Sequence, residues 1–221
     1  NGDITVSGDI ILARANSQSC YNVAGAYAYM TTAGYPYNVI NRGDINVLTN
    51  VKLHSNITNT EHCKLNIGGL TGYSTRAIQE GGANYGNITI GKEGVTQTIQ
   101  ANGIYVGGFG AHASSILSPV TNEGDVIIHD KVEMTTGTSL WIGGMGGLIT
   151  GNINSCTNKG DVTYNGKVTI GTDGTTNIGG IIGTQGGSSF LNSSNEGDVT
   201  FDGETSGALY MGGCVGYSTA A

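Results

Sequence analysis

The stretch Asn122-Glu123-Gly124-Asp125-Val126-Ile127-Ile128 decides the fold, because its pattern returns throughout the chain of 221 residues. It joins an Asn-x-Gly-Asp anchor to apolar residues at alternating positions. Further copies occupy residues 41–44, 84–87, 158–161 and 195–198, and a shortened copy stands at Gly2-Asp3. The anchor glycines, at positions 2, 43, 86, 124, 160 and 197, are 41, 43, 38, 36 and 37 residues apart. Such a period indicates an internal structural repeat.

A second anchor, a Gly-Gly pair after an aliphatic residue, alternates with the first along the chain. It reads Ile142-Gly143-Gly144-Met145 in one copy. Equivalent segments occupy residues 67–70, 106–109, 178–181 and 211–214, with a degenerate copy at 23–26. Because the two anchors keep the same order throughout, they define one repeating unit of 33–44 residues.

Apolar residues alternate with a period of two after the first anchor and before the second, as in Val126/Ile128 and Leu140/Ile142. That alternation is typical of a β-strand with one buried face. A few short strands cannot bury their apolar face alone, whereas stacked units pair in parallel and share a core. We therefore predict an all-β fold, a parallel β-helix or β-solenoid of about six coils, as a single array over residues 1–221. The chain starts and stops within a repeat, so we expect it to be part of a longer protein.

The anchor residues have predicted structural roles in such a stack. Asparagines at equivalent positions lie above one another, so their amides can form a hydrogen-bonded ladder. The predicted ladder consists of Asn41, Asn84, Asn122, Asn158 and Asn195. The anchor glycine suits a corner that needs positive φ, and the Gly-Gly pair suits a turn with no room for a Cβ. The residue after each asparagine varies, which predicts an unconstrained, solvent-facing position.

Composition narrows the classes of partner. Glycine accounts for 39 residues and proline for two, yet 38% of residues are hydrophobic, so neither a collagenous nor a disordered chain fits. The net charge is −7, and the nine Lys and Arg residues form no cluster, which argues against nucleic acid as a partner. The sequence has no apolar stretch long enough to cross a bilayer, so we predict no membrane insertion.

The units Ile178-Gly179-Gly180-Ile181-Ile182-Gly183 and Asn158-Lys159-Gly160-Asp161-Val162 resemble the GLUG-type repeats of bacterial surface and secreted proteins, especially from Bacteroidetes and Firmicutes. The resemblance covers about residues 20–217 and implies a scaffold rather than an activity. In that family the arrays belong to large exported proteins, including adhesins and immunoglobulin-A-type peptidases whose catalytic motif lies elsewhere. The resemblance thus implies an extracellular or cell-surface location.

Two features of the first anchor resemble functional motifs. Arg42-Gly43-Asp44 matches an integrin-binding tripeptide, but the repeat itself dictates Gly-Asp. Asp3, Asp44, Asp125, Asp161 and Asp198 form a column that Asn87 interrupts. Stacked carboxylates repel unless backbone N–H groups cap them or Ca²⁺ bridges them. Turn capping is the commoner use of aspartate, so we predict no cofactor and no metal site, with Ca²⁺ as the alternative.

The region around residues 20–40, where the repeat is most degenerate, carries the candidate binding patch. Clustered tyrosines suit sugar or protein recognition, because each gives a large contact area for little entropy loss. The alternative is that they pack against a preceding coil. The predicted patch consists of Tyr21, Tyr27, Tyr29, Tyr35 and Tyr37.

The cysteines do not form a metal-binding pattern. Cys20 and Cys63 stand five and six residues before their Gly-Gly corners, so stacking could bring them within range of a disulfide. Cys156 and Cys214 fall in apolar columns and are predicted to be buried thiols.

No His-Glu-x-x-His, Gly-x-Ser-x-Gly or Gly-Lys-Ser/Thr motif occurs, so we predict that the chain is not an enzyme. The leading interpretation is a non-catalytic structural or adhesive segment, a stalk or binding surface of an exported bacterial protein. Its partners would be neighbouring coils or domains, with glycans or a host surface protein as ligands. The alternatives are a carbohydrate-binding or carbohydrate-cleaving β-helix and a non-catalytic region of a large secreted peptidase.

Overall fold

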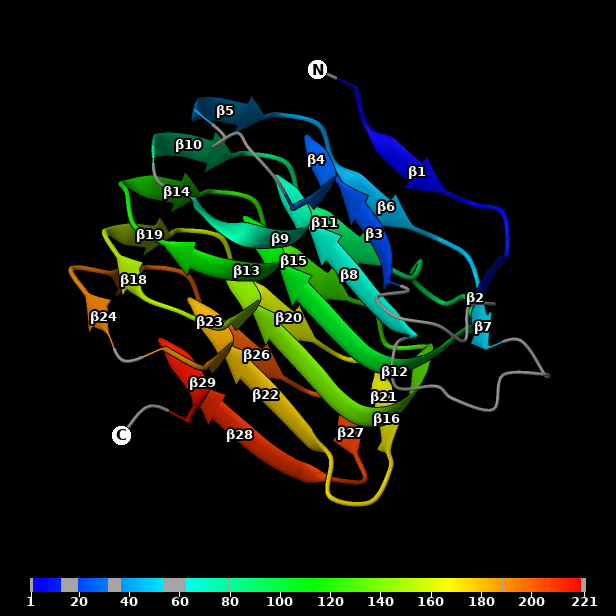
Figure 1. Cartoon of the computed structure of the whole chain (residues 1–221). Helices are drawn as coiled ribbons and strands as arrows, with labels where there is room; N and C mark the ends of the chain where they lie inside the picture. Colours follow the sequence, from blue (N-terminus) through cyan, green and yellow to red (C-terminus); the bar gives the residue numbers. More distant parts are fainter. Residues whose placement is uncertain are drawn as a thin grey trace.

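The computed structural model is an all-β solenoid (Figure 1), as predicted. It describes residues 2–12, 20–31, 37–53, 63–78, 80–187 and 189–219, with only the backbone at Cys20, Tyr37 and Glu80. Strands of successive coils lie side by side and pair in parallel, as in the in-register pairing of Val126, Ile127 and Ile128 with Val162, Thr163 and Tyr164.

The coils contribute strands to the sheets of the stack in the same order along the chain. Coil 1 comprises β1 (Ile4–Val6), β2 (Ile10–Leu12), β3 (Cys20–Ala24), β4 (Tyr27–Met30) and β5 (Tyr37–Asn41). Coil 2 comprises β6 (Ile45–Val47), β7 (Val51–Leu53), β8 (Lys64–Gly68), β9 (Thr71–Ile78) and β10 (Glu80–Asn84). Coil 3 comprises β11 (Ile88–Ile90), β12 (Gln97–Gly107), β13 (Gly110–Ile116) and β14 (Val120–Asn122).

The later coils follow the same order. Coil 4 comprises β15 (Val126–Ile128), β16 (Val132–Gly143), β17 (Gly146–Ile149), β18 (Ile153–Asn154) and β19 (Cys156–Asn158). Coil 5 comprises β20 (Val162–Tyr164), β21 (Lys167–Ile170), β22 (Thr175–Gly179), β23 (Ile182–Gln185), β24 (Phe190–Leu191) and β25 (Ser194–Asn195). Coil 6 comprises β26 (Val199–Phe201), β27 (Glu204–Thr205), β28 (Ala208–Gly212) and β29 (Val215–Ser218).

Four parallel sheets result from the stacking. A six-stranded sheet runs β1-β6-β11-β15-β20-β26, and a five-stranded sheet runs β25-β19-β14-β10-β5. The ten-stranded sheet has two halves, β2-β7-β12-β16-β21-β27 and β3-β8-β12-β16-β22-β28, which the long strands β12 and β16 join. The eight-stranded sheet holds β4, β9, β13, β17, β18, β23, β24 and β29. Because the five-stranded sheet has no strand from coil 6, the array makes five complete turns and part of a sixth.

The two sequence anchors pack against each other and divide the core. A Cβ on Gly108, the second glycine of its pair, would stand 2.5 Å from Nδ2 of Asn122, the anchor asparagine of the same coil. One core cluster, which includes Ile104, Ile128 and Ile142, lies between the six- and ten-stranded sheets. The other includes Phe109 and Met145 and lies between the eight- and five-stranded sheets. The close contact between Gly108 and Asn122 explains why the two anchors recur together.

Close approach, rather than positive φ, explains the anchor glycines. The glycines with positive φ in the described part of the chain are Gly81, Gly82, Gly91 and Gly94, and none of them is an anchor glycine. A Cβ on Gly124 would instead collide with the carbonyl of Gly86, the anchor glycine one coil earlier. The prediction of positive φ at this corner was therefore wrong, and glycine is needed because the coils stack backbone on backbone.

The corners differ in how constant their lengths are. From Asn122 to Val126 the step is four residues, and the equivalent step is also four in the other coils that contain it. The bulge corner, where the ten-stranded sheet changes from its first half to its second, is variable. Measured between the registered pairs Val51/Lys64, Ile99/Gly103, Met134/Ser139, Val168/Thr175 and Thr205/Ala208, the steps are 13, 4, 5, 7 and 3 residues. The outer corner, between the six-stranded and ten-stranded sheets, lengthens only in coils 3 and 4, where Ile90/Ile99 and Ile128/Met134 are nine and six residues apart.

Candidate functional site

The five predicted ladder asparagines form one continuous column. Nδ2 of Asn41, Asn84, Asn122 and Asn158 each donates to Oδ1 of the next asparagine at 2.8 Å. Each Nδ2 also donates to the carbonyl of its own anchor glycine, as from Asn122 to Gly124 at 2.6 Å. Asn84, Asn122 and Asn158 are fully buried. The column therefore links the coils through buried hydrogen bonds that satisfy both ends of each amide.

The aspartate column caps backbone N–H groups. Oδ1 of Asp125 accepts from the N–H of Asp161 at 2.9 Å, and Oδ1 of Asp161 accepts from Asp198 at 2.8 Å. Asn87 serves equally well, because its Oδ1 accepts from the N–H of Asp125 at 2.9 Å. The requirement at this position is an oxygen acceptor for the next coil, which either residue supplies.

The variable anchor position faces solvent, but its side chains also interact between coils. Nζ of Lys159 lies 3.0 Å from Oε1 of Glu123, and this ion pair raises the pKa of Lys159. The guanidinium of Arg42 lies 4.6 Å from the ring centre of Tyr85, while Oδ1 of Asp44 accepts from the N–H of Asn87 at 2.8 Å. The position is solvent-facing as predicted, and both charged residues of Arg42-Gly43-Asp44 have partners one coil away.

Three tyrosines of the predicted patch, Tyr21, Tyr27 and Tyr29, are described and exposed in coil 1, so the patch as a whole stays a prediction. Tyr21 is registered with the buried Leu65, and its hydroxyl donates to the carbonyl of Ile11 at 2.9 Å. Tyr29 stacks on Tyr73 with ring centres 5.5 Å apart. Tyr27 is registered with the buried Thr71 in another column. Tyr35 and the side chain of Tyr37 lie outside the described residues. The exposure of Tyr21, Tyr27 and Tyr29 arises at the first coil of the stack.

An aromatic and amide seam runs beside the Gly-Gly corners and was not predicted. Side chains seven residues apart meet across the corner, as Tyr105 and His112 do with ring centres 5.7 Å apart. Tyr105 also stacks on Trp141 in the next coil at 5.0 Å. Burial, with a smaller contribution from Lys64, lowers the pKa of His112 to about 4. The ring faces of the seam contact one another, which favours a structural role for these aromatics.

The cysteine predictions have mixed outcomes. The backbone of Cys20 is registered with Lys64, one residue past Cys63. The side chain of Cys20 lies outside the described residues, so the disulfide stays a prediction. Cys156 is buried and its pKa is raised by burial to about 12. Cys214 is exposed, contrary to prediction, because it lies in coil 6, the last described coil of the stack.

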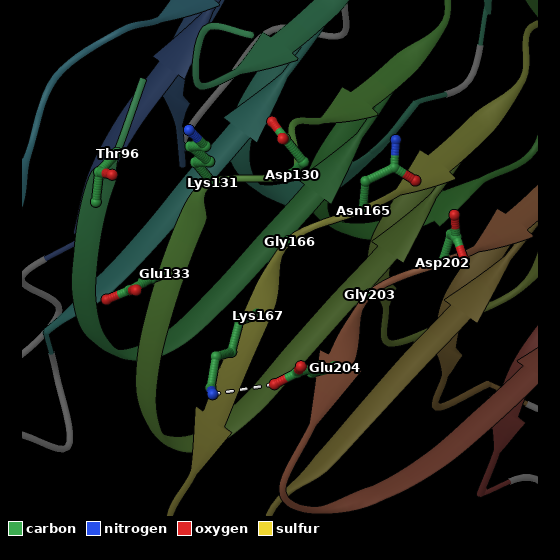
Figure 2. Close-up of a pocket in the computed structure, with 10 residues that line it drawn as sticks. All are labelled: Thr96, Asp130, Lys131, Glu133, Asn165, Gly166, Lys167, Asp202, Gly203 and Glu204. Atoms are coloured by element: carbon green, nitrogen blue, oxygen red, sulfur yellow. Dashed lines mark ion pairs between the residues drawn. The ribbon is translucent and has the colours of Figure 1, made fainter. Parts of the chain in front are cut away.

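A charged pocket of ≈ 280 Å³ lies at the outer corner, where coils 3 and 4 are longest. Figure 2 shows the acidic and basic side chains at its rim, including the ion pair between Nζ of Lys167 and Oε2 of Glu204 at 3.0 Å. Glu133, Lys167 and Glu204 are registered on adjacent strands, so the charges alternate along the stack. The pocket is lined by Thr96, Asp130, Lys131, Glu133, Asn165, Gly166, Lys167, Asp202, Gly203 and Glu204.

The four carboxylates of this pocket, from Asp130, Glu133, Asp202 and Glu204, are exposed. Sequence analysis missed the pocket because its residues come from coils 3 to 6, far apart in the sequence.

No group of three or more His, Cys, Asp or Glu side chains in the described part of the chain is arranged to hold a metal ion. Among the same residues, no helix has the length and apolar character of a membrane span. Comparison of the chain with protein-family models, with curated proteins and with solved structures found no match.

Proposed function

We propose that the chain is a non-catalytic structural and adhesive segment of an exported bacterial protein, serving as a stalk or binding surface outside the cell. The observation that carries the proposal is the asparagine column, which crosses four successive coil junctions with 2.8 Å hydrogen bonds. The aspartate column runs beside it and caps the N–H groups of the following coils. Together they make a rod whose coils are joined by side chains as well as by backbone pairing.

Resistance to proteolysis and pulling is the property that such a rod offers outside a cell. Each coil is held on both sides by parallel pairing, so local opening requires breaking contacts with two neighbours. Carbohydrate binding is the second candidate, and a groove at the bulge corner, described below, favours it. The peptidase-region alternative has no specific observation in its favour.

The structural part of the proposal is tested by removing one amide of the ladder. Asn122→Ala leaves the amide of Asn84 and the carbonyl of Gly124 without their buried partner, so we expect it to cost about 3 kcal/mol in the free energy of unfolding. Urea denaturation and the digestion rate with proteinase K measure the effect. Asn46→Ala, at a half-buried position outside the ladder, is the control and should stay within about 0.5 kcal/mol.

The remaining parts of the proposal need separate measurements. Antibodies raised against the chain should label intact cells of the bacterium that makes it. Labelling only after lysis would overturn export. Release of reducing sugars or peptides from a panel of polysaccharides and proteins by the purified chain would overturn the non-catalytic assignment.

A further inference from the structure

Corner length varies at two places, the outer corner and the bulge corner, which lie at opposite ends of the strands in the first half of the ten-stranded sheet. The Asn-x-Gly-Asp corner keeps a constant step of four residues, whereas the bulge corner takes 13 residues in coil 2 and only four in coil 3. Insertions in solenoid repeats gather on one face, which is often the binding face. The bulge corner is therefore the expected position of a ligand site.

The corners of coils 3 and 4 are short, with steps of four and five residues, whereas coil 5 takes seven. A cavity of ≈ 310 Å³ opens there, and its apolar lining includes Leu53, Ala101 and Ile170. Gly137 and Gly171 contribute no side chains to it. Hydrogen bonds join the corners of coils 3 and 4, because the hydroxyls of Thr136 and Thr138 both donate to the carbonyl of Asn102, at 2.7 and 2.9 Å.

A second cavity of ≈ 550 Å³ adjoins the first, and Ile170 and Gly171 line both. This part exists because coil 5 takes seven residues at the corner and coil 6 takes three, so the turn of coil 5 stands over Ser206. Asp173 holds the turn in a left-handed conformation with φ of 64°. Tyr210, in the last described coil, is 42% exposed and lines this second cavity. We call the two adjoining cavities the corner groove.

The chemistry of the corner groove selects its ligand. Within the described residues, no Lys or Arg side chain lines either cavity, and Asp173 is the one acid. The groove instead combines an apolar floor, an aromatic ring and the hydroxyls of Thr172, Thr175 and Ser206. A pyranose ring presents apolar C–H faces and a rim of hydroxyl groups, which match such a surface.

We propose that the corner groove binds a neutral oligosaccharide along the axis of the solenoid. The inference gives the adhesive part of the proposed function its ligand class, and it rests on that function. The groove spans coils 2 to 6, and adjacent coils are about 4.8 Å apart, so it offers roughly 19 Å of length. That length accommodates several sugar units of one chain. The charged pocket at the outer corner, by contrast, carries two lysines and four carboxylates.

A glycan array probed with the intact chain tests the proposal, using neutral, sialylated and sulfated oligosaccharides as separate sets. We expect binding to neutral glycans, with a Kd that does not change between 50 and about 500 mM NaCl, because no ion pair forms. Titration calorimetry with the best neutral oligosaccharide should show Tyr210→Ala weakening the Kd by about tenfold or more. Tyr85→Ala is the matched control, since Tyr85 is 39% exposed but lies at the Asn-x-Gly-Asp corner.

Two more variants separate loss of the site from loss of the fold. Thr135→Trp places bulk at an exposed lining position of the first cavity and should abolish binding without lowering the melting temperature. Asp173→Asn keeps a residue that tolerates the left-handed turn and should weaken the Kd by severalfold. Silence across the array, preference for anionic glycans, capture of peptides instead of glycans, or equal losses in Tyr210→Ala and Tyr85→Ala would each overturn the glycan site. The rod proposal would survive those results, since it is tested by Asn122→Ala.

Discussion

The Asn-x-Gly-Asp corner and the bulge corner occupy the same coils but obey different rules. At the first, every coil uses the same number of residues, and the side chain of Asn122 bonds both its own turn and the next coil. At the second, the step ranges from three residues in coil 6 to 13 in coil 2. The constant corner specifies the stack, and the variable corner leaves room for a binding surface.

The difference has a physical origin. At the constant corner the backbones of successive coils touch, so that a Cβ on Gly124 or Gly160 would collide with the anchor glycine before it. An added residue there would push the coils apart. At the bulge corner the chain turns at the outside of the stack, where extra residues extend into solvent at a small entropic cost.

Insertion of Gly-Ser at each corner should give the largest difference. Placed between Lys159 and Gly160, it separates Asn158 from the Gly160 carbonyl that its Nδ2 contacts at 2.6 Å, so we expect a loss of more than about 4 kcal/mol. Placed between Asp173 and Gly174, it lengthens an exposed turn and should cost less than about 1 kcal/mol. Thermal unfolding of both variants measures the difference. Equal losses would show that both corners constrain the stack.

Alanine substitutions at two equivalent glycines, Gly180 and Gly213, should show that close approach between coils is the reason why the Gly-Gly corner requires glycine. A Cβ on Gly180 would collide with the carbonyl of Gly213 and the side chain of Asn195, whereas a Cβ on Gly213 would have nothing within 4 Å. We expect Gly180→Ala to cost about 3 kcal/mol and Gly213→Ala to stay within about 0.5 kcal/mol. Chemical denaturation compares them. If Gly213→Ala is as damaging, the backbone conformation of the Gly-Gly corner, rather than contact with the next coil, requires glycine.

The fold was predictable because its constraints are local and repeated. Asn122 and Gly124 stand two positions apart, and their spacing recurs in each full anchor, so the stack and its register follow from the sequence alone. The role of the glycines was harder to predict. The collision of Gly124 with Gly86 involves residues 38 positions apart whose proximity depends on the stacking itself.

The candidate sites were not predictable for a related reason. Tyr210 and Asp173 meet at one groove because two corners differ in length, and such a difference has meaning only once the register is known. The tyrosine count drew attention to residues 20–40, yet Tyr21 and Tyr29 occupy separate columns. Irregularity in corner length would have been the better signal.

The stability of the chain should also depend on pH, through His112 in the seam beside the Gly-Gly corners. His112 lies between Tyr73 and Tyr105, near Lys64, and its pKa is about 4 in the folded chain against 6.5 ordinarily. The unfolded chain therefore takes up the proton first as pH falls, and stability decreases from about pH 6.5 to pH 4 and then levels off. We expect a loss of about 3 kcal/mol over that range. Urea denaturation at each pH, repeated with His112→Gln, should show the dependence reduced in the variant, and an unchanged profile would contradict it.

The smallest expected change in the free energy of unfolding comes from Tyr164, a core residue next to the outer corner. Tyr164 is fully buried, its hydroxyl has no hydrogen-bond partner in the described structure, and its ring stacks on Phe201 at 5.3 Å. Because a buried, unpaired hydroxyl is unfavourable, Tyr164→Phe should raise the free energy of unfolding by about 1 kcal/mol while keeping the stacked ring. Tyr85→Phe, at an exposed ring, should leave stability unchanged under the same urea titration. Destabilisation by Tyr164→Phe would mean that a buried water bonds the hydroxyl, and that the core next to the outer corner holds more water than the core beside the asparagine column.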